Sequence, residues 1–345
     1  MTIALQLVPA HELEAGLLEE ATAFLDSQGS THPFQYPGWA PLQDPRSRNY
    51  CAFVRDGQRI RLFARCATIR PLGKRFPWLE GLVIVRGPVC DDLELLRFSL
   101  TELVSRARQL GFAYIEISPD WVDSQAEKLA EVLVHEGWSR GEGSRASLRL
   151  DLQASADTIF EGLRKTTRYE VRRAERSGVQ VAAATRESEF GGFFELHAEM
   201  ARQKNFLADK PADMVGVLRR LLGEEKRGAL LLASYQGTIR GGIVVVRAGK
   251  RCWYVWGATD KDATVNVGHI LQWHGILWAK QNGCTEYDLG GYSEGATTGP
   301  ALFKRGFSDK VVHFLDTRRY AVDPTRYQCC QLVWKARRRM AGLVS

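Results

Sequence analysis

The alternation of apolar and polar positions over the first 150 residues predicts a layered mixture of strands and helices. Short apolar stretches rich in β-branched and aromatic residues indicate strands, and longer stretches with apolar residues three and four apart indicate helices. The predicted strands are 50–53, 59–68, 82–86 and 112–117. The predicted helices are 11–28, 92–110 and 124–136. Strands that alternate with helices of this length are typical of an α/β layer architecture.

The same kind of pattern begins again near residue 147 and predicts a second α/β unit. Its predicted strands are 147–151, 229–235, 238–248, 250–258 and 285–289, and its predicted helices are 156–177, 190–204 and 267–282. Tyr235-Gln236-Gly237 separates two strand patterns and predicts a hairpin turn. No segment carries the sustained heptads of a coiled coil. The chain therefore reads as two similar units with little sequence identity.

Composition agrees with two globular domains. A chain of 345 residues exceeds one comfortable core, and 45% hydrophobic with 25% charged residues is ordinary. No apolar run approaches the roughly 20 residues that span a bilayer, and the N-terminus lacks the basic start of a signal peptide. Seven scattered cysteines show neither a disulfide framework nor a zinc spacing. We therefore expect a cytoplasmic protein without a bound metal.

The formal net charge of +7 is concentrated in two segments, the predicted helix around 159–177 and the C-terminus from residue 318 onward. Basic clusters attract polyanions through counterion release and long-range steering. We expect the first cluster to contact a nucleic acid or a substrate phosphate, and the second a nucleic acid or an anionic membrane surface. A solvated helix face is the alternative for each cluster.

The segment 287–307 holds the clearest candidate chemistry. A strand-like Tyr-Asp-Leu runs into Gly290 and Gly291, and a polar loop then leads to Phe303, Lys304 and Arg305. Paired glycines permit close approaches that a side chain would block. A Lys-Arg pair on such a loop suits a phosphate or a developing oxyanion. The alternative is a β-loop-β connection with solvated cations.

This segment resembles the end of the second domain in the FemABX peptidyltransferases, which move an amino acid from aminoacyl-tRNA to a peptidoglycan precursor. That family shows Tyr-Asp-aromatic/Leu-Gly-Gly, a variable loop and Phe-Lys-x-Gly-Phe. Three further stretches resemble family segments in the same order along the chain: His32-Pro33-Phe34-Gln35 with Trp39, the Val-Arg-Gly-Pro-Val of 85–89, and the basic helix 163–179 that ends in Gly-Val. The lack of room for a helical arm points to the compact FemX type.

The resemblance implies an α/β fold of two GNAT-like (acyl-CoA N-acyltransferase-like) domains in tandem, residues 1–146 with 316–345 and residues 147–315. It implies transfer of an amino acid from aminoacyl-tRNA to an amine of UDP-MurNAc-pentapeptide or lipid II, with no further cofactor. A lipid-linked acceptor implies work at the inner face of the membrane. The C-terminal stretch is expected to pack on the first domain through Tyr327, Leu332, Val333 and Trp334.

Ester aminolysis of this kind needs two bound partners to be oriented and negative charge to be stabilised. The resemblance makes Lys304 the charge-stabilising residue, and Phe303 a residue that shapes the pocket for the aminoacyl-adenosine end. Tyr254 and Trp256 are expected on one face of their strand. The substrate-binding candidates are Arg202, Lys204, Tyr254, Asp288, Gly290, Gly291 and Arg305. The tRNA-binding candidates are Arg164, Lys165, Arg168, Arg172 and Arg173.

One position departs from the family pattern, and three other functions stay open. Where FemX-like proteins often show an acid before a proline, this chain has Ser118. Either Asp120 or Glu116 substitutes, or no enzyme base is needed. The rival functions are an acyl-CoA-dependent GNAT transferase that binds pyrophosphate at the helix start near Gly268, an aminoacyl-tRNA-dependent ligase with a non-muropeptide acceptor, and a non-catalytic RNA-binding protein.

Overall fold

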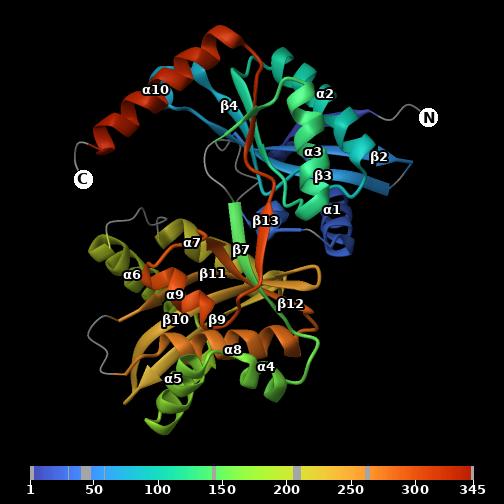
Figure 1. Cartoon of the computed structure of the whole chain (residues 1–345). Coiled ribbons are helices and arrows are strands. Elements are labelled where there is room, and N and C mark those ends of the chain that lie inside the picture. The colour runs from blue at the N-terminus through green and yellow to red at the C-terminus, as the bar shows by residue number, and fades with distance from the viewer. Residues whose placement is uncertain are drawn as a thin grey trace. The chain divides into compact units, whose positions relative to one another are not determined.

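The computed structural model describes residues 4–29, 31–39, 48–57, 59–141, 145–204, 211–260 and 265–342. Contacts within the chain divide it into two compact units (Figure 1). Unit 1 comprises Met1–Pro37, Pro41–Arg145 and His313–Ser345, and unit 2 comprises Gly38–Ala40 and Ala146–Val312. The domain bounds that the sequence suggests, 1–146 with 316–345 and 147–315, remain a prediction.

Unit 1 is built on a mixed sheet whose described strands follow the order β1-β2-β3-β4-β5-β14-β6. The pair β4 and β5 is parallel, and the other neighbours are antiparallel. The strands are β1 Leu5–Pro9, β2 Tyr50–Asp56, β3 Arg59–Ile69, β4 Gly81–Val85, β5 Tyr114–Ser118, β6 Ser139–Arg140 and β14 Arg318–Ala321. The helices are η1 Ala10–Glu12, α1 Ala15–Ser27, η2 Pro33–Gln35, η4 Gly73–Arg75, η5 Pro77–Leu79, α2 Leu93–Gln109, α3 Asp123–His135 and α10 Pro324–Gly342. The short η3 Pro37–Trp39 starts at the last residue of the first unit 1 range and otherwise belongs to unit 2.

Unit 2 repeats this plan with the strand order β13-β7-β12-β11-β10-β9-β8, in which β11 and β12 are parallel. The strands are β7 Arg145–Asp151, β8 Gln180–Ala183, β9 Gly228–Tyr235, β10 Thr238–Ala248, β11 Arg251–Thr259, β12 Glu286–Tyr292 and β13 Val311–Phe314. The helices are α4 Ala156–Gly162, α5 Lys165–Arg176, α6 Glu187–Lys204, α7 Pro211–Leu218, the π-helix η6 Arg219–Glu224, α8 Gly268–Gln281 and α9 Gly299–Arg305.

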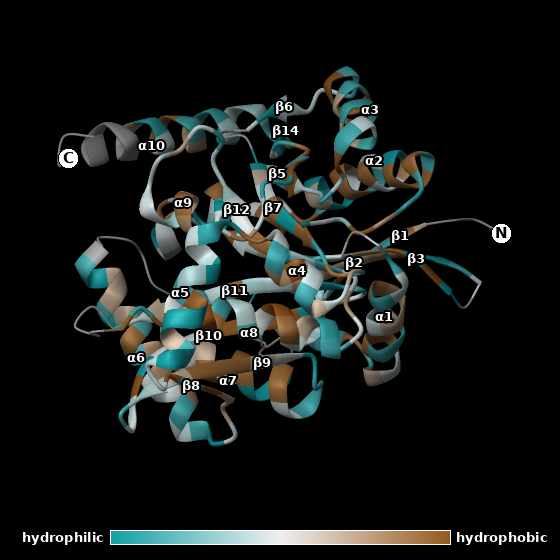
Figure 2. Cartoon of the chain, turned by 60° about the horizontal axis from the view of Figure 1, so that its bottom comes forward, coloured by the Kyte–Doolittle hydropathy of each residue, from teal (hydrophilic) through white to brown (hydrophobic). Residues whose placement is uncertain are grey.

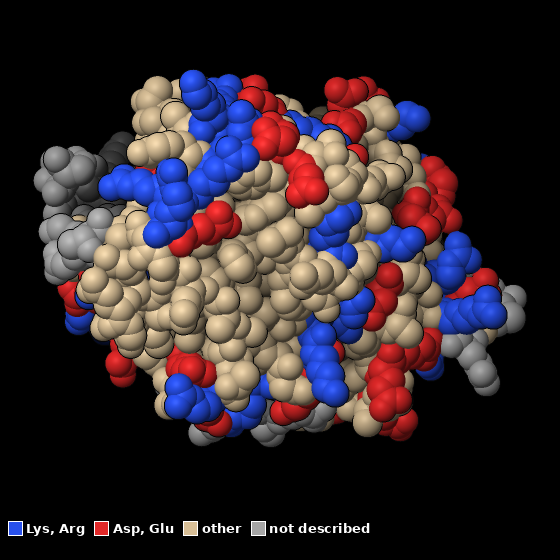
Figure 3. Space-filling model, turned by 90° about the horizontal axis from the view of Figure 1, so that it is seen from below, with Lys and Arg blue, Asp and Glu red and all other residues tan. Residues whose placement is uncertain are grey.

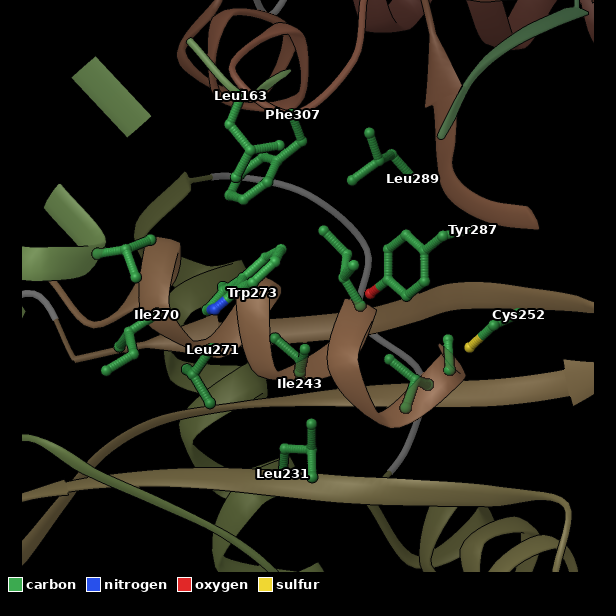
Figure 4. Packing of buried hydrophobic residues seen from close by; sticks show 14 of the residues in the cluster. Leu163, Leu231, Ile243, Cys252, Ile270, Leu271, Trp273, Tyr287, Leu289 and Phe307 are labelled. Carbon is green, nitrogen blue, oxygen red and sulfur yellow. The ribbon is translucent and has the colours of Figure 1, made fainter. Parts of the chain in front are cut away.

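Helix α8 covers one face of the unit 2 sheet, and α6 with α7 covers the other (Figure 1). The α8 face is filled by residues such as Leu271, Trp273 and Tyr287 (Figure 4). The opposite face is filled around Phe193, Phe194 and Leu221. A helix that presents apolar residues on most of its surface is buried by its neighbours; α8 packs between the sheet and the strongly polar α5, which is largely teal in Figure 2.

Most of the predicted elements are present, and the hairpin turn is confirmed. Tyr235 pairs with Thr238, and Gln236 and Gly237 have φ angles of 51° and 76°. Two left-handed residues in a two-residue loop match the right-handed twist of the strands they join. The structure adds strand β1, which the sequence pattern did not predict.

The prediction of one helix over 156–177 is wrong, because the chain breaks after α4 and restarts at α5. Leu163 and Arg164 have extended backbones, with ψ angles of 155° and 143°. Leu163 is buried in the core, and the N–H group of Arg164 donates to the carbonyl of Gly306 at 3.0 Å. These tertiary contacts outweigh the local helix propensity. A straight helix would follow that propensity but would expose the apolar side chain of Leu163.

The C-terminal stretch lies in unit 1, which agrees with its expected packing on the first domain. Strand β14 pairs with β5, and in α10 the rings of Tyr327 and Trp334 pack against Tyr114. The expectation for Leu332 is wrong, since this side chain is 66% exposed. Cys330, which is fully buried, takes the inward position instead. Among the described residues no helix combines the length and the hydropathy that crossing a membrane needs.

Two segments quoted for the family resemblance meet inside unit 1. Gln35 donates through Nε2 to the carbonyl of Val85 at 2.6 Å and accepts the N–H of Arg65 at 2.8 Å. A Cβ on Gly87 would lie 2.8 Å from the amide carbon of Gln35, so this position has room only for glycine. The Pro-Phe-Gln and Arg-Gly-Pro-Val segments therefore pack against each other and are joined by a hydrogen bond.

Candidate functional site

The segment 287–307 is not a strand followed by a cation-bearing loop, because Lys304 and Arg305 lie in the last turn of helix α9. Strand β12 continues to Tyr292, and its pairing with β7 shifts between Asp288 and Gly291. Gly290 has a φ of +77°, which glycine adopts at little cost. A shift of register with a left-handed glycine is a β-bulge, a feature common beside functional sites.

Asp288 holds this bulge in place. Its Oδ1 accepts the N–H of Gly290 at 2.9 Å and the hydroxyl of Ser147, and its Oδ2 accepts Nε of Arg149 at 3.0 Å. The side chain is fully buried. These hydrogen bonds orient the loop, and the assignment of Asp288 to substrate binding stays a prediction.

Lys304 reaches the bulge from α9. Its Nζ donates to the carbonyl of Gly291 at 2.7 Å, and a Cβ added to Gly290 would lie 3.7 Å from the same Nζ. Burial lowers the pKa of Lys304, while the nearby charge of Asp288 opposes that shift. The result is a partly buried cation fixed at a strand bulge.

Arg305 forms a surface ion pair. Its Nε lies 3.2 Å from Oδ1 of Asp309, and the same oxygen accepts Nη2 of Arg164 at 2.7 Å. All three side chains are exposed, so the pairs contribute little to stability. They do link the start of α5 to the end of α9.

A cavity of about 680 Å³ lies beside Phe303, entirely within unit 2. Its described walls are apolar or uncharged and come from the sheet, from α6, α8 and α9, and from the segments that precede α8 and α9. The lining residues are Met200, Gly242, Ile243, Tyr254, Gly257, Ala258, Thr259, Asn266, Gly268, Gln272, Thr298, Gly299, Pro300 and Phe303. A concave site with few polar groups is the usual form of a small-molecule or cofactor site.

Phe303 also covers the N-terminus of α8. A Cβ on Gly268 would lie 3.6 Å from the ring of Phe303, and the N–H of Gly268 already donates to Oδ1 of Asn266 at 3.1 Å. His269 packs on Phe303 with ring centroids 5.0 Å apart. Asn266 therefore occupies one backbone N–H of this helix start, and Phe303 and His269 pack beside it.

The prediction that Tyr254 and Trp256 share one face of their strand is wrong. Trp256 pairs with Val244 and Tyr254 with the next residue, Val245, so the register shifts by one between them. This bulge leaves Val255 as the extra residue and reverses the usual alternation. Tyr254 therefore packs on the α8 side and lines the cavity, whereas Trp256 packs on the α6 side.

Trp256 is stacked by Trp39, the tryptophan of the first family-like segment. Their ring centroids lie 5.2 Å apart with planes inclined by 19°, and Phe194 meets Trp256 edge-on at 5.6 Å. Arg220 of η6 donates through Nε to the carbonyl of Gly38 at 2.8 Å. These contacts explain why the short piece Gly38–Ala40 belongs to unit 2.

Gln272 is the lining residue that sequence reasoning missed. It is fully buried, and its Nε2 donates to the hydroxyl of Tyr287 at 2.7 Å. The available signal was a polar residue at an apolar position, since Gln272 follows Ile270 and Leu271 and precedes Trp273 on the buried side of α8. Buried polar side chains are uncommon without a specific partner.

The basic cluster lies on α5, but its cations are not equivalent. Nη1 of Arg168 donates to the carbonyls of Glu161 and Leu163 at 2.5 and 2.6 Å, so this side chain secures the end of α4. Arg172 pairs with the Glu161 carboxylate at 3.0 Å. The exposed residues of α5 are Lys165, Thr166, Tyr169, Arg172, Arg173, Glu175 and Arg176.

Charged side chains are unevenly spread over the surface. On the face drawn in Figure 3, Lys and Arg gather in patches with Asp and Glu beside many of them, and a broad area between carries neither. Arg202, a candidate for phosphate contact, pairs with Glu199 on the exposed side of α6. The side chain of Lys204, the other candidate, lies outside the described residues. Both assignments stay predictions.

The side chains of Ser118, Asp120 and Glu116 all make hydrogen bonds or ion pairs within unit 1. The Ser118 hydroxyl accepts the N–H of Arg86, whose φ is +61°. Asp120 is buried, and its Oδ1 accepts Nη1 of Arg86 at 3.0 Å and Nη2 of Arg145 at 2.7 Å. Glu116 accepts Nε of Arg319 at 2.6 Å.

A metal centre is not found in the part of the chain that the structure describes, where no three His, Cys, Asp or Glu side chains gather closely enough to hold an ion. Lys304 follows the cavity-lining Phe303 in the sequence, and its Nζ is held at the carbonyl of Gly291 near the buried Asp288. Their arrangement provides a fixed positive charge beside an uncharged pocket, which suits stabilisation of a developing oxyanion.

Comparison with known proteins identifies the fold. Residues 162–305 match the acetyltransferase (GNAT) domain family. The chain is 22% identical over 187 residues to UDP-N-acetylmuramoylpentapeptide-lysine N(6)-alanyltransferase of Weissella viridescens. That match covers 53% of this chain and 55% of the relative, so the chain spans about half the length of the curated protein it matches.

Solved structures cover more of the chain. FemX superposes with a TM-score of 0.78 at 16% identity, over 90% of this chain and 98% of that one. A tandem GNAT protein from the clavulanic acid biosynthesis pathway gives 0.54 at 13% identity, over 93% and 99%. This chain therefore has a FemX-like structure of two GNAT-like units in tandem, and the predicted fold class is confirmed.

Proposed function

We propose that this protein is an aminoacyltransferase that moves an amino acid from aminoacyl-tRNA to an amine of a peptidoglycan precursor, UDP-MurNAc-pentapeptide or lipid II. The observation that carries the proposal is the position of Lys304. Its Nζ is fixed at the Gly290–Gly291 bulge, and the preceding residue, Phe303, lines the uncharged cavity. The FemX-like fold and the name of the alanyltransferase relative support this choice of substrates.

In this reaction the acceptor amine attacks the carbonyl carbon of the ester that joins the amino acid to the tRNA. A C–N bond forms, and negative charge develops on the carbonyl oxygen, where the Lys304 ammonium stabilises it. The C–O bond then breaks, and the proton lost by the amine goes to the departing ribose oxygen. Phe303 and Tyr254 shape the cavity for the aminoacyl end.

No carboxylate is assigned as a base. Asp120 and Glu116, the two candidates, are both engaged in ion pairs with arginines in unit 1. Burial raises the pKa of Asp120, but the charges of Arg86 and its neighbours outweigh this and hold that pKa below its usual value. Such an acid is a weak proton acceptor, so positioning and charge stabilisation carry the mechanism.

An acyl-CoA-dependent GNAT transferase stays an alternative, because residues 162–305 match the acetyltransferase (GNAT) domain and Gly268, at the start of α8, lines the cavity. A non-muropeptide acceptor remains the second candidate, because Ser118 departs from the family pattern at the acceptor side. The acceptor is therefore the first variable to test.

The test mixes the purified full chain with charged tRNA pools and UDP-MurNAc-pentapeptide and follows amino-acid transfer with and without ribonuclease. We expect transfer that ribonuclease abolishes. Lys304→Ala should lower turnover about a hundredfold or more, whereas Lys310→Ala, which removes an exposed lysine, should not. Transfer that resists ribonuclease and needs acyl-CoA would refute the proposal. Transfer from tRNA to peptides but not to muropeptides would favour the second candidate.

A further inference from the structure

Gln272 presents an unused hydrogen-bond acceptor at the cavity. The side chain lines the cavity and is fully buried, and its Nε2 is occupied by the hydroxyl of Tyr287. Its Oε1 is buried and has no hydrogen-bond partner among the described residues. Native proteins pair nearly all buried polar atoms, so an unpaired acceptor in a cavity wall indicates a ligand that donates to it.

The amide of Gln272 is held rigidly. Tyr287 is fully buried, and Figure 4 shows its hydroxyl directed toward α8. A Cβ on Gly275 would lie 2.8 Å from that hydroxyl, so the ring fits closely against the helix. The 2.7 Å hydrogen bond to Nε2 then fixes the amide plane and with it the direction of Oε1. A fixed acceptor discriminates between ligands better than a mobile one.

The surroundings narrow the chemistry of the ligand. None of the described lining residues is charged, and Asn266 already spends its side-chain oxygen on the N–H of Gly268. Oε1 can accept only from an N–H or O–H group. In the proposed reaction the group that enters this cavity is an aminoacyl ester. It carries an amino group on Cα and, in hydroxy amino acids, a hydroxyl on Cβ.

We infer that Gln272 is a specificity-determining residue, whose Oε1 accepts a hydrogen bond from the donor group on Cα or Cβ of the transferred acyl group. The inference rests on the proposed function. It gives the enzyme a means to reject acyl groups that lack such a donor, because they would leave the buried oxygen unpaired. The two sources, amine and hydroxyl, share one chemistry and are separated by the experiment.

The experiment measures initial rates with one RNA helix esterified with propionyl, alanyl or seryl groups, and UDP-MurNAc-pentapeptide as acceptor. Propionyl carries neither donor, alanyl carries the amine, and seryl carries both. Wild type should prefer alanyl to propionyl if the amine is bound, or seryl to alanyl if the hydroxyl is bound. Gln272→Leu should reduce that preference about tenfold.

Tyr287→Phe is the matched comparison, because it removes the hydrogen bond that orients the amide but leaves the Gln272 acceptor in place. It should lose less of the preference than Gln272→Leu does. An unchanged preference in Gln272→Leu, or an equal loss in both variants, overturns the inference. Gln272→Met repeats the test if the leucine variant does not fold. Absence of transfer from all three donors by wild type instead removes the proposed function, and the inference with it.

Discussion

At the scale of single residues, the site depends on how one lysine is held. Lys304 Nζ is partly buried, donates to one carbonyl and lies near the carboxylate of Asp288. Burial and this carboxylate act in opposite directions on its pKa, and burial prevails. A cation whose pKa is lowered in this way loses its charge at a lower pH than an exposed lysine does.

The first prediction concerns the pH dependence of turnover. The ammonium form stabilises the oxyanion, so the rate should fall as pH rises through the Lys304 pKa, which lies below the usual 10.5. Arginine keeps its charge to higher pH. Lys304→Arg should therefore turn over more slowly, but its rate should begin to fall only at a higher pH than that of the wild type. Initial rates, corrected for uncatalysed ester loss, measure both limbs. Identical limbs would show that another group titrates.

At the scale of elements, the β12 bulge and helix α9 form one device. The bulge presents a carbonyl and α9 presents the lysine, while Gly306 ends α9 against α5. A Cβ on Gly306 would lie 2.3 Å from the hydroxyl oxygen of Thr167. A displacement of the bulge should therefore change the position of Lys304 Nζ.

Gly290 and Gly291 offer a matched pair of substitutions. Gly290 has a φ of +77°, and a Cβ there would lie 3.4 Å from the carbonyl oxygen of Tyr254, whereas a Cβ on Gly291 meets nothing within 4 Å. Gly290→Ala should lower the free energy of unfolding by about 1–2 kcal/mol and reduce turnover. Gly291→Ala should change both much less. Urea unfolding and transfer rates measure the difference, and equal effects would contradict the role given to the bulge.

Helix α5 gives a second prediction at this scale. Arg172→Glu with Arg173→Glu should weaken tRNA binding and flatten its salt dependence, because fewer counterions are released. Arg168 is unsuitable for this test, since it secures the end of α4. Arg186→Glu, an exposed change just before α6, serves as the control. Unchanged affinity in the double variant would leave α5 a solvated surface.

Sequence patterns predicted most of the elements but not these local details. Strands β9 and β10 carry continuous apolar runs separated by a short polar turn, so both strands and the turn could be predicted from the sequence. The bulge at Val255 adds one residue without altering the apolar run, so the opposed faces of Tyr254 and Trp256 could not be predicted. Helix α9 is seven residues long and starts with Gly and Pro, which read as a loop. Gln272 is only a polar residue in an apolar helix until its neighbours are placed.

At the scale of the whole molecule, each unit contains a buried ion pair: Asp120 with Arg86 and Arg145 in unit 1, and Asp288 with Arg149 in unit 2. Asp120 is held by Arg86 and Arg145, and both guanidinium groups lie over the ring of Phe314 at 5.0 and 5.4 Å. These residues come from distant parts of the chain that join in unit 1. Removal of one partner leaves an unpaired buried charge.

Asp120→Asn should therefore lower the free energy of unfolding by about 3–5 kcal/mol near neutral pH. The folded pKa of Asp120 lies below 3.8, so its contribution is present above that value and is lost as pH falls through the folded pKa. The variant should accordingly show a weaker acid dependence. Asp56→Asn, at an exposed pair, should cost less than about 1 kcal/mol. Equal losses in urea unfolding would refute the assignment.

The hydrogen bond from Lys304 to Gly291 ends on an atom that every amino acid possesses. No codon change at position 291 can delete that carbonyl, and only a change in the path of the backbone can move it. The anchor of the lysine is therefore insulated from side-chain drift at residue 291 itself. Selection on this contact acts instead on Gly290 and Asp288, which set the path of the backbone.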